Sequence, residues 1–201
     1  MRAIASEGLA HAVNPYDIER YERLLSMASH RYGHLANLPS PAVDKMFRQD
    51  LGMVTPKLGV EGAIVASGRV LVTRRADDGR WSLPGGWVNP NESVTTAVRR
   101  EVLEETGLRV RVQDLVAVLS RDAALPSTPH GSCHLLFACQ IISGKLRPSH
   151  ESTEFLYWDP WKPLRWHRDH RKKARAAVQF MRDRDSETTA GHRAPSKLAG
   201  S

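Results

Sequence analysis

The chain has 201 residues, of which 41% are hydrophobic and 25% charged, and its net charge is +7 at neutral pH. These values are typical of a folded protein with one ordinary domain and an appendage, and they exclude a disordered or fibrous chain. Because no run of about 18 apolar residues occurs and the N-terminal residues lack a long apolar centre, we expect neither a membrane span nor a secretory signal.

Charge and cysteine content indicate which ligands and which cellular compartment to expect. An excess of positive charge attracts polyanions, among them phosphorylated substrates and nucleic acid. The two cysteines, Cys133 and Cys139, belong to one apolar run. On an extended strand they would stand about 20 Å apart, at about 3.3 Å per residue, which is too far for a disulfide. We therefore expect free thiols and a reducing, cytoplasmic compartment.

The first fifty residues carry helix signals. A helix should begin after Asn14, a good N-cap residue that is followed by Pro15 at the first helical position. Its apolar residues recur at steps of three and four: Ile18, Tyr21, Leu25, Ala28 and Tyr32. A second helical segment should open at Ser40 and stop at Gly52. Its apolar residues are Val43, Met46, Phe47 and Leu51. Residues 1–55 are too few to bury much surface alone, so we expect this helical extension to pack on the main domain or on a second subunit.

From residue 57 the pattern changes to β-branched runs. The expected strands are Gly62–Ala66, Val70–Thr73, Leu115–Leu119, His134–Ile142 and Phe155–Trp158. Ser67 and Gly68 form a hairpin-like turn signal between the first two strands. An irregular alternation of these strands with two helices predicts an α/β fold around a mixed sheet over residues 56–185. The small, polar residues 186–201 should form a disordered tail.

A basic segment precedes this tail. Between Lys162 and Arg184 there are nine Lys or Arg residues and two Asp residues. Apolar residues recur at helical spacing within it, which indicates a terminal helix with a solvated basic face. The alternative interpretation is a dedicated patch for nucleic acid.

The residues that carry chemistry lie between Leu83 and Leu108. Glu101, Glu104 and Glu105 stand at positions i, i+3 and i+4, so their carboxylates share one face of a helix. Like charges at this spacing repel one another, and the arrangement therefore favours a divalent cation among them. An all-oxygen donor set without a convergent His or Cys favours Mg²⁺, or Mn²⁺, over zinc.

The preceding loop fits such a site. Glycines 85 and 86 allow a sharp turn and a close approach of the chain, so a backbone carbonyl of this turn could add a metal ligand. Arg100 follows Glu92 by a little over two helical turns, so its guanidinium can grip the loop carboxylate and brace the loop. Three arginines before the turn either hold substrate phosphates or are solvated loop charges: Arg74, Arg75 and Arg80.

The spacing of the whole stretch resembles the Nudix box. Its fixed positions are Gly86, Glu92, Arg100, Glu101, Val102, Glu104, Glu105, Gly107 and Leu108, and every one is filled. The chain is similar to the Nudix hydrolases over about residues 57–184. The resemblance implies a Nudix-type α/β/α sandwich around a mixed sheet, with a small helical N-terminal extension.

The resemblance also implies roles for individual residues. The implied metal ligands are Glu101, Glu104, Glu105 and the carbonyl of Gly85. The implied catalytic residues are Glu101, Arg100, Glu92 and Glu154. The general base in the family is either a carboxylate of the box or a glutamate from a later loop. Glu154 is the candidate for that later glutamate, and Glu151 is its competitor.

The implied reaction is Mg²⁺-dependent hydrolysis of the diphosphate in a nucleoside diphosphate linked to another moiety, of the ADP-ribose, CDP-choline or UDP-sugar type. The run NPYDIERYERLLSMA resembles the helical extension of a Nudix subgroup with these activities, which implies a homodimer. One alternative is hydrolysis at the 5′ end of RNA, favoured by the basic segment. Another is a ligand sensor without catalysis, against which the intact set of glutamates argues. Loops such as residues 122–133 would read the base and the sugar, and they carry no decodable pattern.

Overall fold

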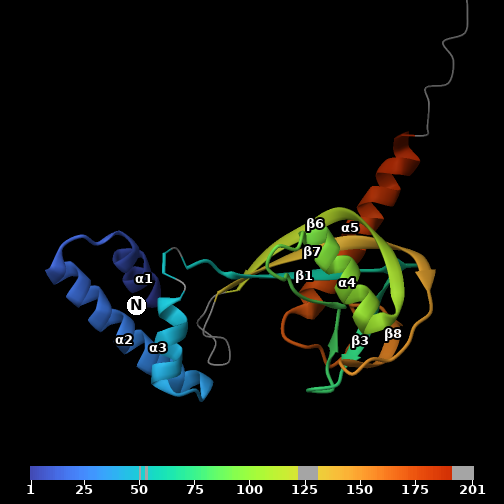
Figure 1. Cartoon of the computed structure of the whole chain (residues 1–201). Coiled ribbons are helices and arrows are strands. Elements are labelled where there is room, and N and C mark those ends of the chain that lie inside the picture. The colour runs from blue at the N-terminus through green and yellow to red at the C-terminus, as the bar shows by residue number, and fades with distance from the viewer. Residues whose placement is uncertain (50, 53, 122–130, 192–201) are drawn as a thin grey trace, which may run out of the picture. The chain divides into compact units, whose positions relative to one another are not determined.

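The computed structural model describes residues 1–49, 51–52, 54–121 and 131–191 (Figure 1). The chain forms two units, the first comprising Met1–Lys57 with Arg121–Ser132 and the second comprising Leu58–Ser120 with Cys133–Ser201. The boundary predicted from the sequence lies between residues 55 and 56, and the N-terminal segment of the first unit runs to Lys57. In the described ranges, no helix is both long and apolar enough to cross a membrane.

Helices form the described part of the first unit up to residue 49: α1 (Arg2–His11), α2 (Pro15–Ala36) and α3 (Ser40–Arg48). The Asn14 side chain caps α2 by accepting a hydrogen bond from the backbone N–H of Tyr16 at 2.9 Å, so the predicted start of this helix is confirmed. Helix α1 was not predicted as a separate helix, because Met1 at its N-cap offers no capping side chain. Helix α3 ends at Arg48, earlier than the predicted stop at Gly52.

The first unit has a small apolar core. Its buried residues are Ala5, Leu25, Ala28, Val43 and Phe47. Tyr32 packs edge-on against Phe47, with ring centroids 5.3 Å apart. The two predicted helical segments therefore bury only some of their apolar residues, since Ile18, Met46 and Leu51 are exposed. A core of this size leaves much apolar surface of the unit uncovered.

The second unit combines strands with two further helices. The strands are β1 (Lys57–Ala63), β2 (Val65–Ala66), β3 (Arg69–Arg75), β4 (Trp81–Ser82), β5 (Gly85–Trp87), β6 (Leu108–Arg121), β7 (Ser132–Gly144) and β8 (Ser152–Trp158). The helices are α4 (Val94–Thr106) and α5 (His170–Gly191). One sheet has the order β5-β1-β7-β6, and in the other β3 pairs with β2, β4 and β8. The predicted turn between β2 and β3 is confirmed, with φ of 49° at Ser67 and 72° at Gly68, as the tight hairpin turn requires.

Helices α4 and α5 cover opposite faces of these sheets (Figure 1). Alternate residues of each strand point to opposite faces, so Leu71 packs toward α4 while Val70 and Val72 pack toward α5. On β7, Phe137 faces α4 and Leu136 faces α5. The predicted α/β/α sandwich around a mixed sheet is therefore confirmed. Helix α5 continues through residues 186–191, which the sequence analysis assigned to the tail.

Both cysteines lie on β7 as free thiols, so the prediction of no disulfide between them is confirmed. Cys139 is buried in the cluster under α4, and burial raises the pKa of its thiol to about 12. A Cβ added to Gly62 would lie 3.3 Å from the Cys139 sulfur and 2.7 Å from a Val102 methyl group. Glycine at this position therefore lets α4 lie close against β1.

Candidate active site

Helix α4 presents the predicted glutamates at one end of the sandwich. The Ser93 side chain caps the helix by accepting from the Thr96 backbone N–H at 3.2 Å, and Gly107 ends it in the left-handed conformation with φ of 76°. Glu101 and Glu105 turn inward and are 9% and 6% exposed. The Glu104 side chain lies at the rim and is 59% exposed. Two of the three carboxylates are therefore largely removed from water.

The glycine turn of β5 makes room for these carboxylates. A Cβ on Gly86 would lie 2.5 Å from Glu101 Oε1, so a larger residue would displace that side chain. A Cβ on Gly85 would lie 2.1 Å from the carbonyl oxygen of Val60 on the neighbouring strand. The backbone N–H of Gly85 donates a hydrogen bond to Glu105. The turn thus approaches α4 with its backbone, as the two glycines predict.

Arg100 connects the helix to the loop before it. Its Nε and Nη2 donate to Oε1 and Oε2 of Glu92, both at 2.9 Å, in the two-pronged geometry that the sequence analysis expects of a bracing pair. Nη1 donates to Glu101 at 2.7 Å and to Glu104 at 3.2 Å, and Nη2 also donates to the carbonyl of Trp87 at 3.0 Å. Arg100 therefore contacts two of the expected metal ligands as well as the loop.

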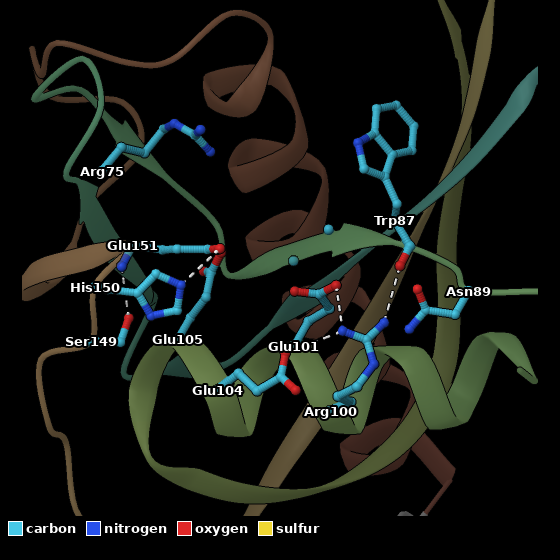
Figure 2. Close-up of a pocket in the computed structure, with 12 residues that line it drawn as sticks. Arg75, Trp87, Asn89, Arg100, Glu101, Glu104, Glu105, Ser149, His150 and Glu151 are labelled. Carbon is cyan, nitrogen blue, oxygen red and sulfur yellow. Dashed lines mark hydrogen bonds and ion pairs between the residues drawn. The ribbon is translucent and has the colours of Figure 1, made fainter.

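These side chains line a cavity of about 600 Å³ (Figure 2). Its lining residues are Arg75, Gly85, Gly86, Trp87, Asn89, Arg100, Glu101, Glu104, Glu105, Ser149, His150 and Glu151. They come from β3, β5, the loop after β5, α4 and the segment before β8. In Figure 2, Glu151 and His150 lie on the side of the cavity next to Glu105, and Arg100 lies on the side of Trp87. The fold therefore gathers four glutamates around one space.

The later glutamates and the arginines divide between this cavity and the outer surface. Glu151 lines the cavity, whereas Glu154 lies on β8 opposite Arg74 of β3 and forms an ion pair with it at 2.5 Å. Arg75 lines the cavity and is paired with Asp77 at 2.5 Å. Neither Arg74 nor Arg80 is among the lining residues. The structure therefore brings Glu151 and Arg75, but not Glu154, together with the glutamates of α4.

Burial and like charge determine the protonation of the cluster. Burial, with the nearby charges of Glu101 and Glu151, raises the pKa of Glu105 to about 8. Burial also raises the pKa of Glu101, although Arg100 opposes the shift. In contrast, the hydrogen bonds from Arg100 hold the pKa of Glu92 at about 2. In this metal-free arrangement Glu105 is therefore the carboxyl that retains a proton near neutral pH.

The donor set fits a hard divalent cation in its chemistry. All the candidate ligands supply oxygen, and Glu105 Oε2 is buried with no hydrogen-bond partner among the described residues. Over those residues, however, no group of three or more His, Cys, Asp or Glu side chains is arranged to hold a metal ion. Two of the candidate ligands, Glu101 and Glu104, accept hydrogen bonds from Arg100. The residue types match the ion.

Sequence reasoning missed three loop residues that line the cavity. Asn89, Ser149 and His150 lie in loops and carry no motif. For the last two, the available signal was their position directly before Glu151 and the predicted strand that begins at Phe155. The predicted specificity loop, residues 122–133, lies outside the described residues apart from its last three.

Comparison with known proteins identifies the family. Residues 57–183 match the family model of the NUDIX domain. The chain belongs to the Nudix family. It is a Nudix hydrolase, and the predicted family and enzyme class are confirmed. Members of the Nudix family generally use divalent metal ions. Residues 1–47 match a second family model, the UDP-X-like N-terminal oligomerisation domain.

Several relatives of this Nudix hydrolase carry names that specify a reaction. The candidate ADP-ribose pyrophosphatase YjhB of Bacillus subtilis is 29% identical over 94% of this chain and 92% of its own length. The ADP-ribose pyrophosphatase of Methanocaldococcus jannaschii is 32% identical over 52% of this chain and 62% of its own length.

Solved structures share the fold. An ADP-ribose pyrophosphatase from Streptococcus suis superposes with a TM-score of 0.56 at 28% identity, covering 64% of this chain and 93% of that one. A UDP-X diphosphatase superposes with a TM-score of 0.60 at 24% identity, covering 92% of this chain and 91% of that one. The second likeness bears on the fold alone, and it extends over nearly the whole chain.

Proposed function

We propose that this Nudix hydrolase is a Mg²⁺-dependent pyrophosphohydrolase that cleaves the diphosphate of a nucleoside diphosphate linked to another moiety. The observation that carries the proposal is the cavity in which Glu101, Glu104, Glu105 and Glu151 converge. An acidic cavity of this kind repels a diphosphate unless cations intervene, so it suits a reaction in which metal and substrate bind together. Among the expected substrate types, the names of the relatives favour ADP-ribose.

Each charged side chain has a part in the proposed reaction. Glu101, Glu104 and Glu105 would hold the ion, Mg²⁺ or Mn²⁺, and the carbonyl of Gly85 would be a further ligand. When bound, the ion neutralises charge on the diphosphate oxygens and lowers the pKa of water. Arg100 orients Glu101, fixes the loop after β5 through Glu92, and holds the end of β5 through the carbonyl of Trp87.

The general base of the proposed reaction is Glu151. Its carboxylate lines the cavity beside Glu105, where it can accept the proton of the attacking water. Glu154, the candidate from the resemblance, faces Arg74 and is not among the lining residues, so its role remains a prediction without support from the geometry. Arg75 borders the same cavity and is placed to meet substrate phosphates.

A panel of nucleoside diphosphate derivatives tests the proposal. ADP-ribose, CDP-choline and UDP-sugars would be incubated with Mg²⁺ and separately with Mn²⁺, followed by a phosphatase, and released phosphate would be measured. We expect cleavage of at least one compound only when both metal and enzyme are present. A wild-type enzyme that cleaves none of them with either metal would refute the proposed function.

We further propose that the chain works as a homodimer joined through its N-terminal helices. The match of residues 1–47 to an oligomerisation domain supports this. So does the exposure of large apolar side chains on the first unit: Ile4, Val13, Tyr16, Met27, Leu35 and Met46. A second copy would cover surface that the small core of the unit cannot.

Light scattering with size-exclusion chromatography tests the dimer. Met27→Glu places a charge on exposed apolar surface of α2 and should yield a folded monomer. Arg23→Glu on the same helix is the control, since it adds negative charge at an exposed polar site and should leave the dimer intact. If Met27→Glu stays a dimer, and removal of residues 1–52 also leaves the subunit number unchanged, the N-terminal helices do not mediate assembly.

The basic segment supports one second candidate function, hydrolysis at the 5′ end of RNA. Lys162, Arg165, Arg168 and Lys172 are exposed, and they form no ion pair within the described part of the chain. Such charges attract a polyanion in a salt-dependent way. Activity on triphosphorylated RNA that exceeds activity on ADP-ribose and falls steeply with salt would favour this candidate over the small-molecule substrate.

A further inference from the structure

Next to the acidic cavity, Trp87 of β5 and His134 of β7 form an aromatic row across the strand between them, β1. Strand β1 lies between β5 and β7, and Gly59 of β1 is paired with Trp87 of β5. A Cβ on Gly59 would lie 2.7 Å from Nδ1 of His134 on β7, so the imidazole lies over this glycine. The rings of Trp87 and His134 therefore meet across it, with centroids 5.5 Å apart and planes inclined by 49°. Glycine in the middle strand makes this ring contact possible.

Trp87 joins this row to the metal-binding face. Gly86 faces Glu101, so the next side chain along the strand points to the opposite face of the sheet. Figure 2 shows the indole of Trp87 directed away from the glutamates of α4, while its backbone carbonyl accepts a hydrogen bond from Arg100. The residue is thus anchored to the acidic cluster by its backbone and extends an aromatic ring away from it.

Buried charges hold the second ring of the row. Oε1 of Glu61 accepts from His134 Nδ1 at 2.8 Å and from Lys173 Nζ, although its Oε2 has no hydrogen-bond partner among the described residues. Burial opposes ionisation of Glu61, but the bond from His134 and the charge of Lys173 outweigh it and lower its pKa. A carboxylate can only accept, so Nδ1 carries the proton and the orientation of the His134 ring is fixed.

The other tryptophans have different surroundings. Trp81 is buried in the core beneath α5, and Trp158 and Trp166 pack against that core. Trp161 is 41% exposed, but Arg182 lies over its ring at 4.8 Å. Trp87 is 48% exposed, and of the tryptophans it alone is among the residues lining the cavity. Trp87 thus combines a backbone that faces the acidic cavity with an exposed indole directed away from it, and an indole coordinates neither metal nor phosphate.

We propose that Trp87, backed by His134, is the subsite for the nucleobase of the substrate. The inference rests on the proposed function, because it assumes that the substrate contains a nucleotide. A nucleotide separates its base from its phosphates by a ribose, and Trp87 likewise separates its ring from the Arg100 and Glu101 cluster that the phosphates would approach. Stacking on an aromatic ring accepts every base, since each has a π face. The subsite therefore selects for the presence of a base and favours the larger purines over pyrimidines.

Calorimetry of product-like ligands tests the subsite without relying on turnover. AMP, GMP, CMP, UMP and the base-free ribose 5-phosphate would each be titrated into the enzyme with Mg²⁺ present. Removal of one stacking side chain typically weakens binding by about tenfold or more. We expect wild type to bind AMP about tenfold more tightly than ribose 5-phosphate, and Trp87→Ala to lose that preference while its affinity for ribose 5-phosphate is unchanged.

Two variants serve as matched controls. Trp87→Phe retains a ring and should keep most of the preference for AMP. Trp161→Ala removes a tryptophan of similar exposure, 41% against 48%, that is not among the residues lining the cavity, and this variant should bind all five ligands as wild type does. With a hydrolysed substrate, Trp87→Ala should raise KM about tenfold and change kcat far less, since the base is remote from the reacting phosphorus.

Three outcomes would overturn the inference. In the first, Trp87→Ala retains the preference for AMP. In the second, it weakens the binding of AMP and of ribose 5-phosphate equally, which would mean that the residue acts only through Arg100. In the third, wild type binds none of the four nucleotides more tightly than ribose 5-phosphate. The proposed function fails separately: an enzyme that binds AMP through Trp87 yet cleaves no nucleoside diphosphate derivative would refute the activity and leave the subsite standing.

Discussion

Glu105 lies on the α4 side of the sheet, and Glu61 lies on the α5 side. Both glutamates are buried, at 6% and 3% exposure, and each has one oxygen that lacks a partner among the described residues. Their other surroundings differ. His134 and Lys173 donate to Glu61 and lower its pKa, whereas burial and neighbouring carboxylates raise the pKa of Glu105 to about 8.

The difference separates a structural charge from a functional one. Glu61 has its counter-charge within the fold, so its energy is balanced before any ligand arrives. Glu105 has like charges around it and is balanced only when a cation from outside enters or when it takes up a proton. The following experiments would break or sharpen this contrast, in order of decreasing expected effect.

Neutralising one glutamate of the candidate metal site should abolish most turnover. Glu101→Gln and Glu105→Gln each remove one charge from the cation site, and metal assistance contributes several kcal/mol, so kcat should fall by about a thousandfold. The metal-free Glu105→Gln protein should be at least as stable as wild type near neutral pH, because the buried amide is neutral without taking up a proton, as the Glu105 carboxyl must do. Steady-state rates and thermal unfolding in a chelator measure both effects. Activity within a few-fold of wild type would remove these residues from the metal site.

Breaking the buried ion pair of Lys173 with Glu61 should instead lower the stability of the fold. Lys173→Met leaves Glu61 buried without its cation, which should lower the free energy of unfolding by about 3 to 5 kcal/mol. Lys172→Met, at the exposed neighbouring position, is the control and should change stability little. Urea unfolding followed by circular dichroism compares the two. Equal stability of the two variants would show that Glu61 does not depend on Lys173.

The two later glutamates give a smaller and more selective effect. If Glu151 is the general base, Glu151→Gln should lower kcat by about a hundredfold, as expected when proton transfer is lost. Glu154→Gln disrupts only an exposed ion pair with Arg74 and should keep nearly full activity. Steady-state rates at saturating Mg²⁺ distinguish them. The reverse ranking would restore Glu154 as the base.

The smallest expected effect comes from the protonation of Glu105. Its pKa is about 8 in the folded metal-free protein against an ordinary value of 4.5, so the folded state binds the proton more tightly than the unfolded state. Stability of the metal-free protein should therefore fall as pH rises from about 4.5 to about 8. Metal binding at pH 7 should release close to one proton, because the ligand must ionise. Calorimetry in buffers of different ionisation enthalpy measures this release, and its absence would mean that Glu105 is already ionised.

Local signals in the sequence predicted much of the fold and the outline of the site. Caps and spacing depend on residues a few positions apart, which is why the start of α2 and the shared face of the three glutamates could be read directly. The pairing of Arg100 with Glu92 is also short in sequence and was expected from two helical turns. The additional bonds from Arg100 to Glu101 and Glu104 were not, since they depend on side-chain rotamers.

Contacts between distant residues could not be predicted in this way. Lys173 lies in a segment whose basic residues were interpreted as solvated, yet it is fully buried because Glu61, 112 residues away, offers a carboxylate beneath α5. The ion pair of Arg74 with Glu154 spans 80 residues and results from the register of β3 with β8. That register leaves Glu151, before the strand, to line the cavity, and nothing in the local sequence distinguishes the two glutamates.

The two thiols of β7 differ in a way that has a practical consequence. Cys139 is 7% exposed beneath α4 with a pKa of about 12, so it has almost no reactive thiolate in the native state, whereas Cys133 is partly exposed. A thiol-specific reagent should therefore label one position in the folded chain, next to His134 of the aromatic row. The rate at which the second thiol, Cys139, is labelled then measures how often α4 separates from the sheet and opens the core.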